Sequence, residues 1–136
     1  MTLRPKLATF RVEAFSSDNR TPSDGSPWDV KLENTIEIGA AVPTAPGQPI
    51  QGVVKLMLQA NAHDTRAPQI TATFRGEYIG LFVYPDEATE PDVMALIASD
   101  DHQYLLSAQV FPLAMSHFRR EMQATGFDGR NLPLGL

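Results

Sequence analysis

Histidines are the side chains here that most readily carry acid–base chemistry or bind a metal ion. The chain has three, His63, His102 and His117, and none stands at an HxxxH or HExxH spacing. His117 has Glu121 four residues on, which is a common surface pair on a helix. His63 precedes Asp64 at the expected end of a strand, where a solvated turn accounts for both. These patterns predict no catalytic base and no metal site.

Carboxylates gather at Asp86, Glu87, Glu90 and Asp92, but without the alternation and central glycine of a calcium loop. Acidic residues before a helix are explained by the helix dipole alone. The chain has no GxGxxG, GK[ST] or GxSxG motif. It also has no cysteine, which excludes disulfides, thiolate metal sites and a cysteine nucleophile. We therefore expect a protein that is not an enzyme and has no cofactor.

Chain length and net charge further restrict the class of protein. The 136 residues suffice for one domain, expected to span 1–136. A net charge of -5 argues against a nucleic-acid partner, which usually meets a basic surface. No apolar run reaches the roughly 18 residues of a membrane span, so no membrane insertion is expected. The first ten residues lack the apolar stretch of a signal peptide, which favours a cytoplasmic location.

Strand patterns precede helix patterns along the chain. The segregated order predicts an α+β fold, a sheet with helices on one side. The short helix is expected to start near Pro91, and Pro112 should bend the long helix, which Gly126 should end. The expected strands are Leu7–Phe15, Trp28–Ile38, Ile50–His63 and Gln69–Tyr84, and the long helix runs from about Gln103 to Thr125.

Alternation assigns faces to the first two strands. In the first, Phe10, Val12 and Ala14 should share one face, with Arg11 and Glu13 on the other. The second strand alternates most clearly, with a charged opposite face and an apolar face made of Trp28, Val30, Leu32, Ile36 and Ile38.

The long helix carries an apolar face at Phe111, Met115, Phe118 and Met122. This face is apolar over more than one stripe, so burying all of it within one chain of this size looks difficult. We therefore expect these four residues to form the sheet–helix core and the centre of an oligomer. Gly76 and Gly80 interrupt the fourth strand, where glycine indicates a bulge or a close backbone approach.

At this point the chain resembles the SecB family of export chaperones. The match runs over most of the length of the chain. It rests on the order and spacing of several short segments rather than on any single motif. The matching segments are Glu13-Ala14, Trp28 with Val30-Lys31-Leu32, Gly80-Leu81-Phe82, Val110-Phe111-Pro112 with Ala114, Phe118, Gly126-Phe127 and Leu132.

The resemblance implies a four-stranded antiparallel sheet with a long C-terminal helix packed on one face. It implies a homotetramer, a dimer of dimers, that needs no cofactor and no ATP. Its activity would be holding unfolded or precursor polypeptides, because apolar side chains including methionine adapt to many sequences. We expect client contacts at Trp28, Val54, Leu56, Leu58, Tyr78, Leu81, Phe82 and Tyr84.

Departures from the family pattern bear on the partner. The family docks a translocase ATPase through acidic residues on the outer sheet face, and only Glu13 matches that set. Thr9 and Arg75 stand at the other two positions, which should weaken docking to a basic surface. Service in protein export and protection of one dedicated client, such as a toxin–antitoxin component, both stay open. The alternatives are a non-catalytic oligomeric adaptor with one fixed partner and a small-molecule enzyme or binder.

Overall fold

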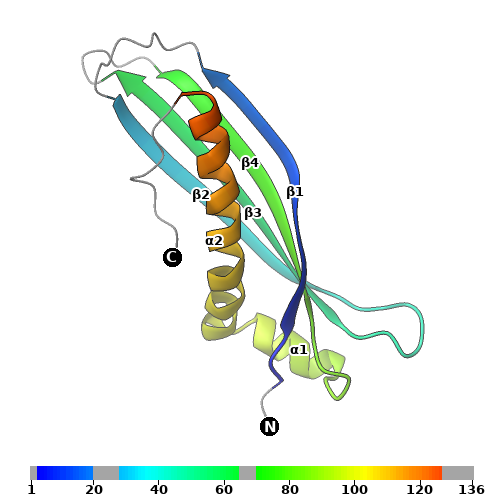
Figure 1. The fold of residues 1–136 in the computed structure, drawn as a ribbon. Coiled ribbons are helices and arrows are strands. Elements are labelled where there is room, and N and C mark those ends of the chain that lie inside the picture. The colour runs from blue at the N-terminus through cyan, green and yellow to red at the C-terminus, as the bar shows by residue number, and fades with distance from the viewer. Residues whose placement is uncertain (1–2, 20–27, 65–69, 127–136) are drawn as a thin grey trace.

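The computed structural model describes residues 3–19, 28–64 and 70–126. Its four strands form one antiparallel sheet, and two helices follow them, as Figure 1 shows. This architecture confirms the expected α+β class with a long C-terminal helix on one face. The elements are β1 (Lys6–Asn19), β2 (Trp28–Ala41), β3 (Gln51–Asp64), β4 (Ile70–Val83), α1 (Glu90–Ile97) and α2 (Asp100–Ala124).

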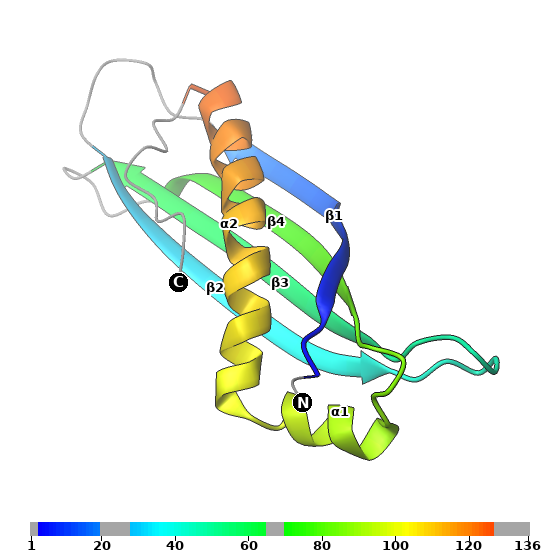
Figure 2. The same cartoon turned by 60° about the horizontal axis from the view of Figure 1, so that its bottom comes forward.

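The strand order in the sheet is β1-β4-β3-β2, so β1 and β2 are its two edges. Each strand is 14 residues long, and all neighbouring strands pair antiparallel. Helix α2 lies along one face of the sheet, and α1 lies near one end of it, as Figures 1 and 2 show. The opposite face of the sheet is left without a covering element among the described residues.

Alternation along the strands places one apolar set against α2. On β3 the helix-facing side chains are Val54, Leu56, Leu58, Ala60 and Ala62, all buried. On β2 the expected alternation is confirmed for Val30, Leu32, Ile36 and Ile38, which pack against the same core. The backbone of Trp28 opens β2, but its side chain lies outside the described residues.

Strand β1 departs from simple alternation. It has register shifts between Leu7 and Thr9 and between Val12 and Ala14. A bulge adds one residue and therefore exchanges the faces of everything after it. Phe15, opposite Gly76, points to the helix side, whereas Ala14, opposite Glu77, does not. The expectation that Ala14 shares a face with Phe10 and Val12 was therefore wrong.

The glycines of β4 mark close approaches of other side chains. A Cβ at Gly80 would lie 2.6 Å from the Val110 side chain of α2, and one at Gly76 would meet the ring of Tyr78. The described register shifts of the sheet lie at other residues. Of the two predictions for these glycines, a bulge or a close approach, the close approach is therefore confirmed. Gly126 takes φ +93°, the left-handed conformation expected at the end of α2.

Two hydrophobic clusters hold the elements together. The larger one lies between the sheet and α2, and its helix side chains include Leu106, Val110 and Phe118. The smaller one joins Tyr84 to Val93 and Ile97 of α1. The sheet is therefore covered by the two helices through separate contacts, and α2 runs without interruption through Pro112. The expected bend at Pro112 stays a prediction.

Candidate functional site

A groove of about 370 Å³ lies between the edge strand β2 and the first half of α2. Two isoleucines of β2 form one wall, and polar or aromatic side chains from the first turns of α2 form the other. The lining residues are Ile36, Ile38, Asp100, Gln103, Tyr104 and Ser107.

The groove combines apolar surface with free backbone. Tyr104 is 60% exposed, the largest exposed fraction among the large hydrophobic side chains of the described residues. Within the described sheet β2 pairs only with β3, so the backbone groups of its other edge have no strand partner. An unpaired edge beside apolar side chains is the arrangement onto which an extended peptide adds as a further strand.

The wall formed by α2 is fixed to the rest of the chain close to the groove. The hydroxyl of Tyr84 lies 2.7 Å from Nε2 of His102 in a buried contact. The Gln103 side-chain amide donates to the Ile97 carbonyl at 2.7 Å. Ser99 is the N-cap of α2, but its side chain makes no capping hydrogen bond. Few polar contacts therefore hold the first turn of α2.

Burial changes the proton affinity of this pair. His102 is 8% exposed, and its burial lowers its pKa below the ordinary 6.5. Burial also raises the pKa of Tyr84 to about 12. At neutral pH the imidazole is therefore neutral, and its tautomer decides whether the hydroxyl or Nε2 donates in this hydrogen bond.

A second tyrosine–histidine pair lies further along α2. The hydroxyl of Tyr78 is 3.0 Å from Nδ1 of His117, whose Nε2 lies 3.4 Å from the Glu121 carboxylate. Burial, and after it the charge of Glu121, raise the pKa of Tyr78 above its usual range. Phe15 packs edge-on against both His117 and Phe118. This half of the helix therefore has a carboxylate beside its histidine.

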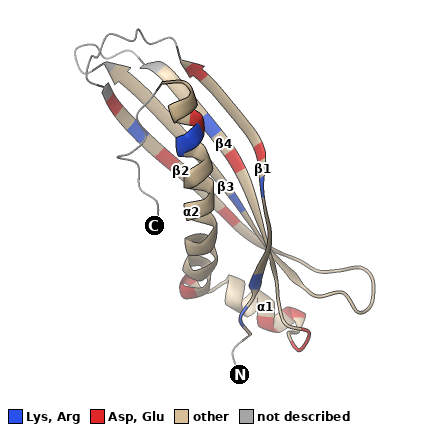
Figure 3. Cartoon of the chain, viewed as in Figure 1, with Lys and Arg blue, Asp and Glu red and all other residues tan. Residues whose placement is uncertain are grey.

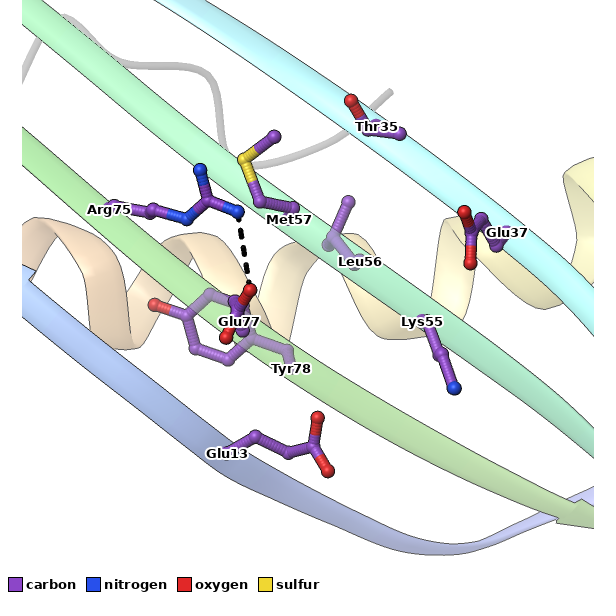
Figure 4. A pocket seen from close by; sticks show the side chains of 9 residues that line it. All are labelled: Glu13, Thr35, Glu37, Lys55, Leu56, Met57, Arg75, Glu77 and Tyr78. Carbon is purple, nitrogen blue, oxygen red and sulfur yellow. Dashed lines mark hydrogen bonds and ion pairs between the residues drawn. The ribbon is translucent and has the colours of Figure 1, made fainter.

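The outer face of the sheet has a hollow of about 350 Å³, shown in Figure 4 with α2 behind the strands. Its charged side chains are of both signs, namely Glu13, Glu37, Lys55, Arg75 and Glu77. Arg75 lies 3.3 Å from Glu77, and Glu13 lies 3.1 Å from Arg11 on the same strand. Figure 3 shows both signs of charge spread along the strands. An acidic surface for a basic partner is therefore absent from this described face, and docking at Glu13 stays a prediction.

Most of the side chains expected to contact a client lie under α2. Six are at most 2% exposed, and in this conformation they present almost no surface to another molecule. They are Val54, Leu56, Leu58, Tyr78, Phe82 and Tyr84. Leu81 is partly buried and has the opposite parity, so it points to the outer face. We therefore assign the six to the core, and the groove is instead formed by their neighbours on β2 and α2.

The apolar stripe of α2 is similarly enclosed. Its four side chains are 0–2% exposed within a single chain and pack on the sheet. They leave no surface for a second subunit, so we assign Phe111, Met115, Phe118 and Met122 to the sheet–helix core alone. The burial that looked difficult is possible because the stripe packs against the buried side chains of β3 and β4.

The sequence reasoning did not find the groove. Ile36 and Ile38 were recognised only as one face of a strand, and Tyr104 was not singled out. An exposed tyrosine near the start of an amphipathic helix was the available signal. The position of β2 at an edge was not available from the sequence reasoning, because strand order depends on contacts far apart in the chain.

Comparison with solved structures identifies the fold. The chain is similar to the SecB-like chaperone Rv1957 of Mycobacterium tuberculosis, with a TM-score of 0.67 and 16% identity. The match covers 96% of this chain and 90% of that one. That structure is a complex with a ChAD peptide from the Rv1956 HigA1 antitoxin. No family model and no curated protein matches the sequence. The chain therefore has a SecB-like fold.

Two features are absent from the described residues, a metal-binding cluster and a membrane-spanning helix. No three side chains among their His, Asp and Glu residues come together as a metal site requires. Neither α1 nor α2 has the length and apolar character to cross a membrane.

Proposed function

We propose that this protein is an ATP-independent, non-catalytic holdase that binds an unfolded or precursor polypeptide in the groove between β2 and α2. One observation carries the proposal, the unpaired edge of β2 beside the exposed ring of Tyr104. Main-chain pairing to a strand edge requires no particular sequence, and Ile36, Ile38 and Tyr104 offer apolar contact to alternate side chains. Such a site selects extended, apolar segments, which folded proteins do not expose.

Binding alone is enough for this activity. A protein that binds only the unfolded form of a client lowers the free concentration of that form and therefore slows its aggregation. No nucleotide has to be hydrolysed for this effect. The peptide bound by the similarly folded Rv1957 supports a polypeptide ligand. Because that peptide comes from an antitoxin, protection of a dedicated client is the version of this function that we favour over general export.

We also propose that the chain assembles in the cytoplasm as a homotetramer, a dimer of dimers. The side of α2 that faces away from the sheet supports this, because Leu113 is 42% exposed there. Leu113→Glu is expected to lower the mass measured by sedimentation velocity, whereas Ser116→Glu on a neighbouring exposed position tests charge alone. An unchanged mass for Leu113→Glu would place the subunit contact elsewhere.

The test of holdase activity is light scattering from an unfolded test protein mixed with an equimolar amount of the chain, without ATP. We expect the chain to suppress scattering and Tyr104→Ser to lose most of that suppression. Val12→Ser is the matched control, because Val12 is 39% exposed on the opposite edge strand. Equal loss in both variants would exclude the groove as the binding site.

An oligomeric adaptor with one fixed partner is the second candidate. The closed core favours it, because six of the expected client-contacting side chains are buried. If the protein is such an adaptor, the folded chain should not suppress the scattering of any unfolded test protein. Suppression of two unrelated test proteins would reject it.

A further inference from the structure

The first two turns of α2 form one wall of the groove. Asp100, Gln103, Tyr104 and Ser107 line the groove, and His102 lies among them on the same two turns. A movement of these turns would therefore change the shape of the groove. The side chain of His102 points away from the groove wall to the buried hydroxyl of Tyr84.

We propose that His102 and Tyr84 form a proton-sensitive latch, in which protonation of His102 releases the first turns of α2 and loosens the groove. Part of this inference, its effect on a bound polypeptide, rests on the proposed function. The movement of the helix does not, and it is measured without any ligand.

The first argument is hydrogen-bond capacity. The Tyr84 hydroxyl and Nε2 of His102 share one hydrogen bond, and both side chains are buried. In a neutral imidazole one ring nitrogen is an acceptor, whereas protonation makes both ring nitrogens donors, so the pair gains one donor that needs a new acceptor. Tyr84 does not remove this extra donor by losing its own proton, because burial raises its pKa to about 12. Acidification therefore leaves one donor of the pair unsatisfied in a buried place, which is costly.

The second argument is the charge around His102. Its own helix contributes Asp100 and Asp101, which are exposed, and α1 contributes Glu90 and Asp92, also exposed. Among the described residues none of these carboxylates forms an ion pair with His102. By strand register, the described side chains of β1, β2 and β3 that face the helix carry no charge, because Glu33, Glu37 and Lys55 point to the outer face. Tyr84, just after β4, is the titratable group in contact with His102. The N-terminus of a helix also repels a positive charge.

His117 is the internal contrast. It also contacts a tyrosine, but its other ring nitrogen lies 3.4 Å from Glu121, which is a counter-ion for the protonated form. Protonation of His117 therefore gains an ion pair, and the second half of α2 is expected to stay in place. The latch is confined to the first half of the helix.

The direction of the effect follows from the lowered pKa of His102. A histidine whose folded-state pKa is depressed contributes fully to stability above the unfolded value of 6.5. That contribution is lost as the pH falls below 6.5. A scan from about pH 8 to about pH 5 spans this value.

Amide hydrogen exchange followed by mass spectrometry tests the latch in the full chain. We expect residues 100–107 of α2 to lose protection between about pH 8 and about pH 5, after correction for the intrinsic rates, while residues 111–122 keep theirs. His102→Gln stays neutral and is expected to remain protected across this range. His117→Gln is the matched control and should show the same loss as the unchanged chain.

Several results would overturn the latch. In the unchanged chain, the latch is rejected if the protection of residues 100–107 does not change with pH. It is also rejected if the loss of protection is spread evenly over α2. The same pH dependence in His102→Gln would also reject it. If that variant fails to fold, an NMR titration of the His102 ring in the unchanged chain decides the question. The latch requires the ring to titrate together with the loss of protection, and separate midpoints contradict it.

Discussion

The two halves of α2 cover the same sheet but are held in different ways. The second half packs Phe118 and His117 against the ring of Phe15, and the Asn19 side chain donates to the Thr125 carbonyl at 3.0 Å. The first half packs Leu106 and Val110 into the core and adds the buried tyrosine–histidine contact and the Gln103 hydrogen bond. The groove lies beside the first half. The difference between the halves is the charge beside the histidine, because Glu121 lies next to His117 and no carboxylate forms an ion pair with His102 among the described residues.

The largest expected effect comes from the second half of α2. Phe118→Ala removes a ring that is completely buried and that no other side chain replaces. We expect a loss of about 3–5 kcal/mol in the free energy of unfolding, measured by urea denaturation. Gln123→Ala, at an exposed position on the same helix, is the control and should cost far less. A Phe118→Ala chain as stable as the Gln123→Ala chain would contradict the packing of this ring in the core.

Gly80 tests how closely the middle of the helix must approach the sheet. An added Cβ would lie 2.6 Å from a methyl group of Val110, so Gly80→Ala has to push α2 outwards. Overpacking of this kind costs about 1–3 kcal/mol, and thermal unfolding measures it. At Gly39 no atom lies within 4 Å of an added Cβ, so Gly39→Ala is the matched control. Similar melting temperatures for the two variants would contradict the close packing at Val110.

Removing the hydroxyl of Tyr84 or of Tyr78 compares the two tyrosine–histidine contacts of α2. Tyr84→Phe removes the partner of the buried Nε2 of His102 and should cost about 1–3 kcal/mol at neutral pH. Tyr78→Phe should cost less, because His117 keeps Glu121 and is less completely buried. Urea denaturation of both variants measures the difference. A larger loss for Tyr78→Phe would contradict the stronger dependence of the fold on the Tyr84–His102 contact.

The helix caps give the smallest expected effect. Thr89 of α1 forms a capping box with Asp92, whereas the Ser99 side chain makes no capping bond at the start of α2. Thr89→Ala should therefore cost about 1 kcal/mol, and Ser99→Ala close to nothing. Circular dichroism during thermal unfolding compares them. An equal loss in both variants would mean that the first turn of α2 is capped as firmly as α1.

Sequence patterns predicted the fold better than the site. Alternation on β2 and the apolar stripe of α2 follow directly from the side-chain periods of strands and helices, so these elements were found close to their observed bounds. Ala14 was assigned to the wrong face because a bulge gives no sign in the alternation before it. Tyr78 and Tyr84 were taken for surface residues because the side chains that cover them come from the helices, from α2 for Tyr78 and from α1 for Tyr84.

Photo-cross-linking tests the central claim most directly. A benzoylphenylalanine placed at Tyr104, in place of a ring that is already 60% exposed, reports what lies in the groove. The same residue at Val12 reports on the opposite edge of the sheet. The account predicts that an unfolded test protein cross-links strongly from position 104 and weakly from position 12. Equal yields from the two positions, or no cross-link from position 104 by a chain that still suppresses aggregation, would contradict it.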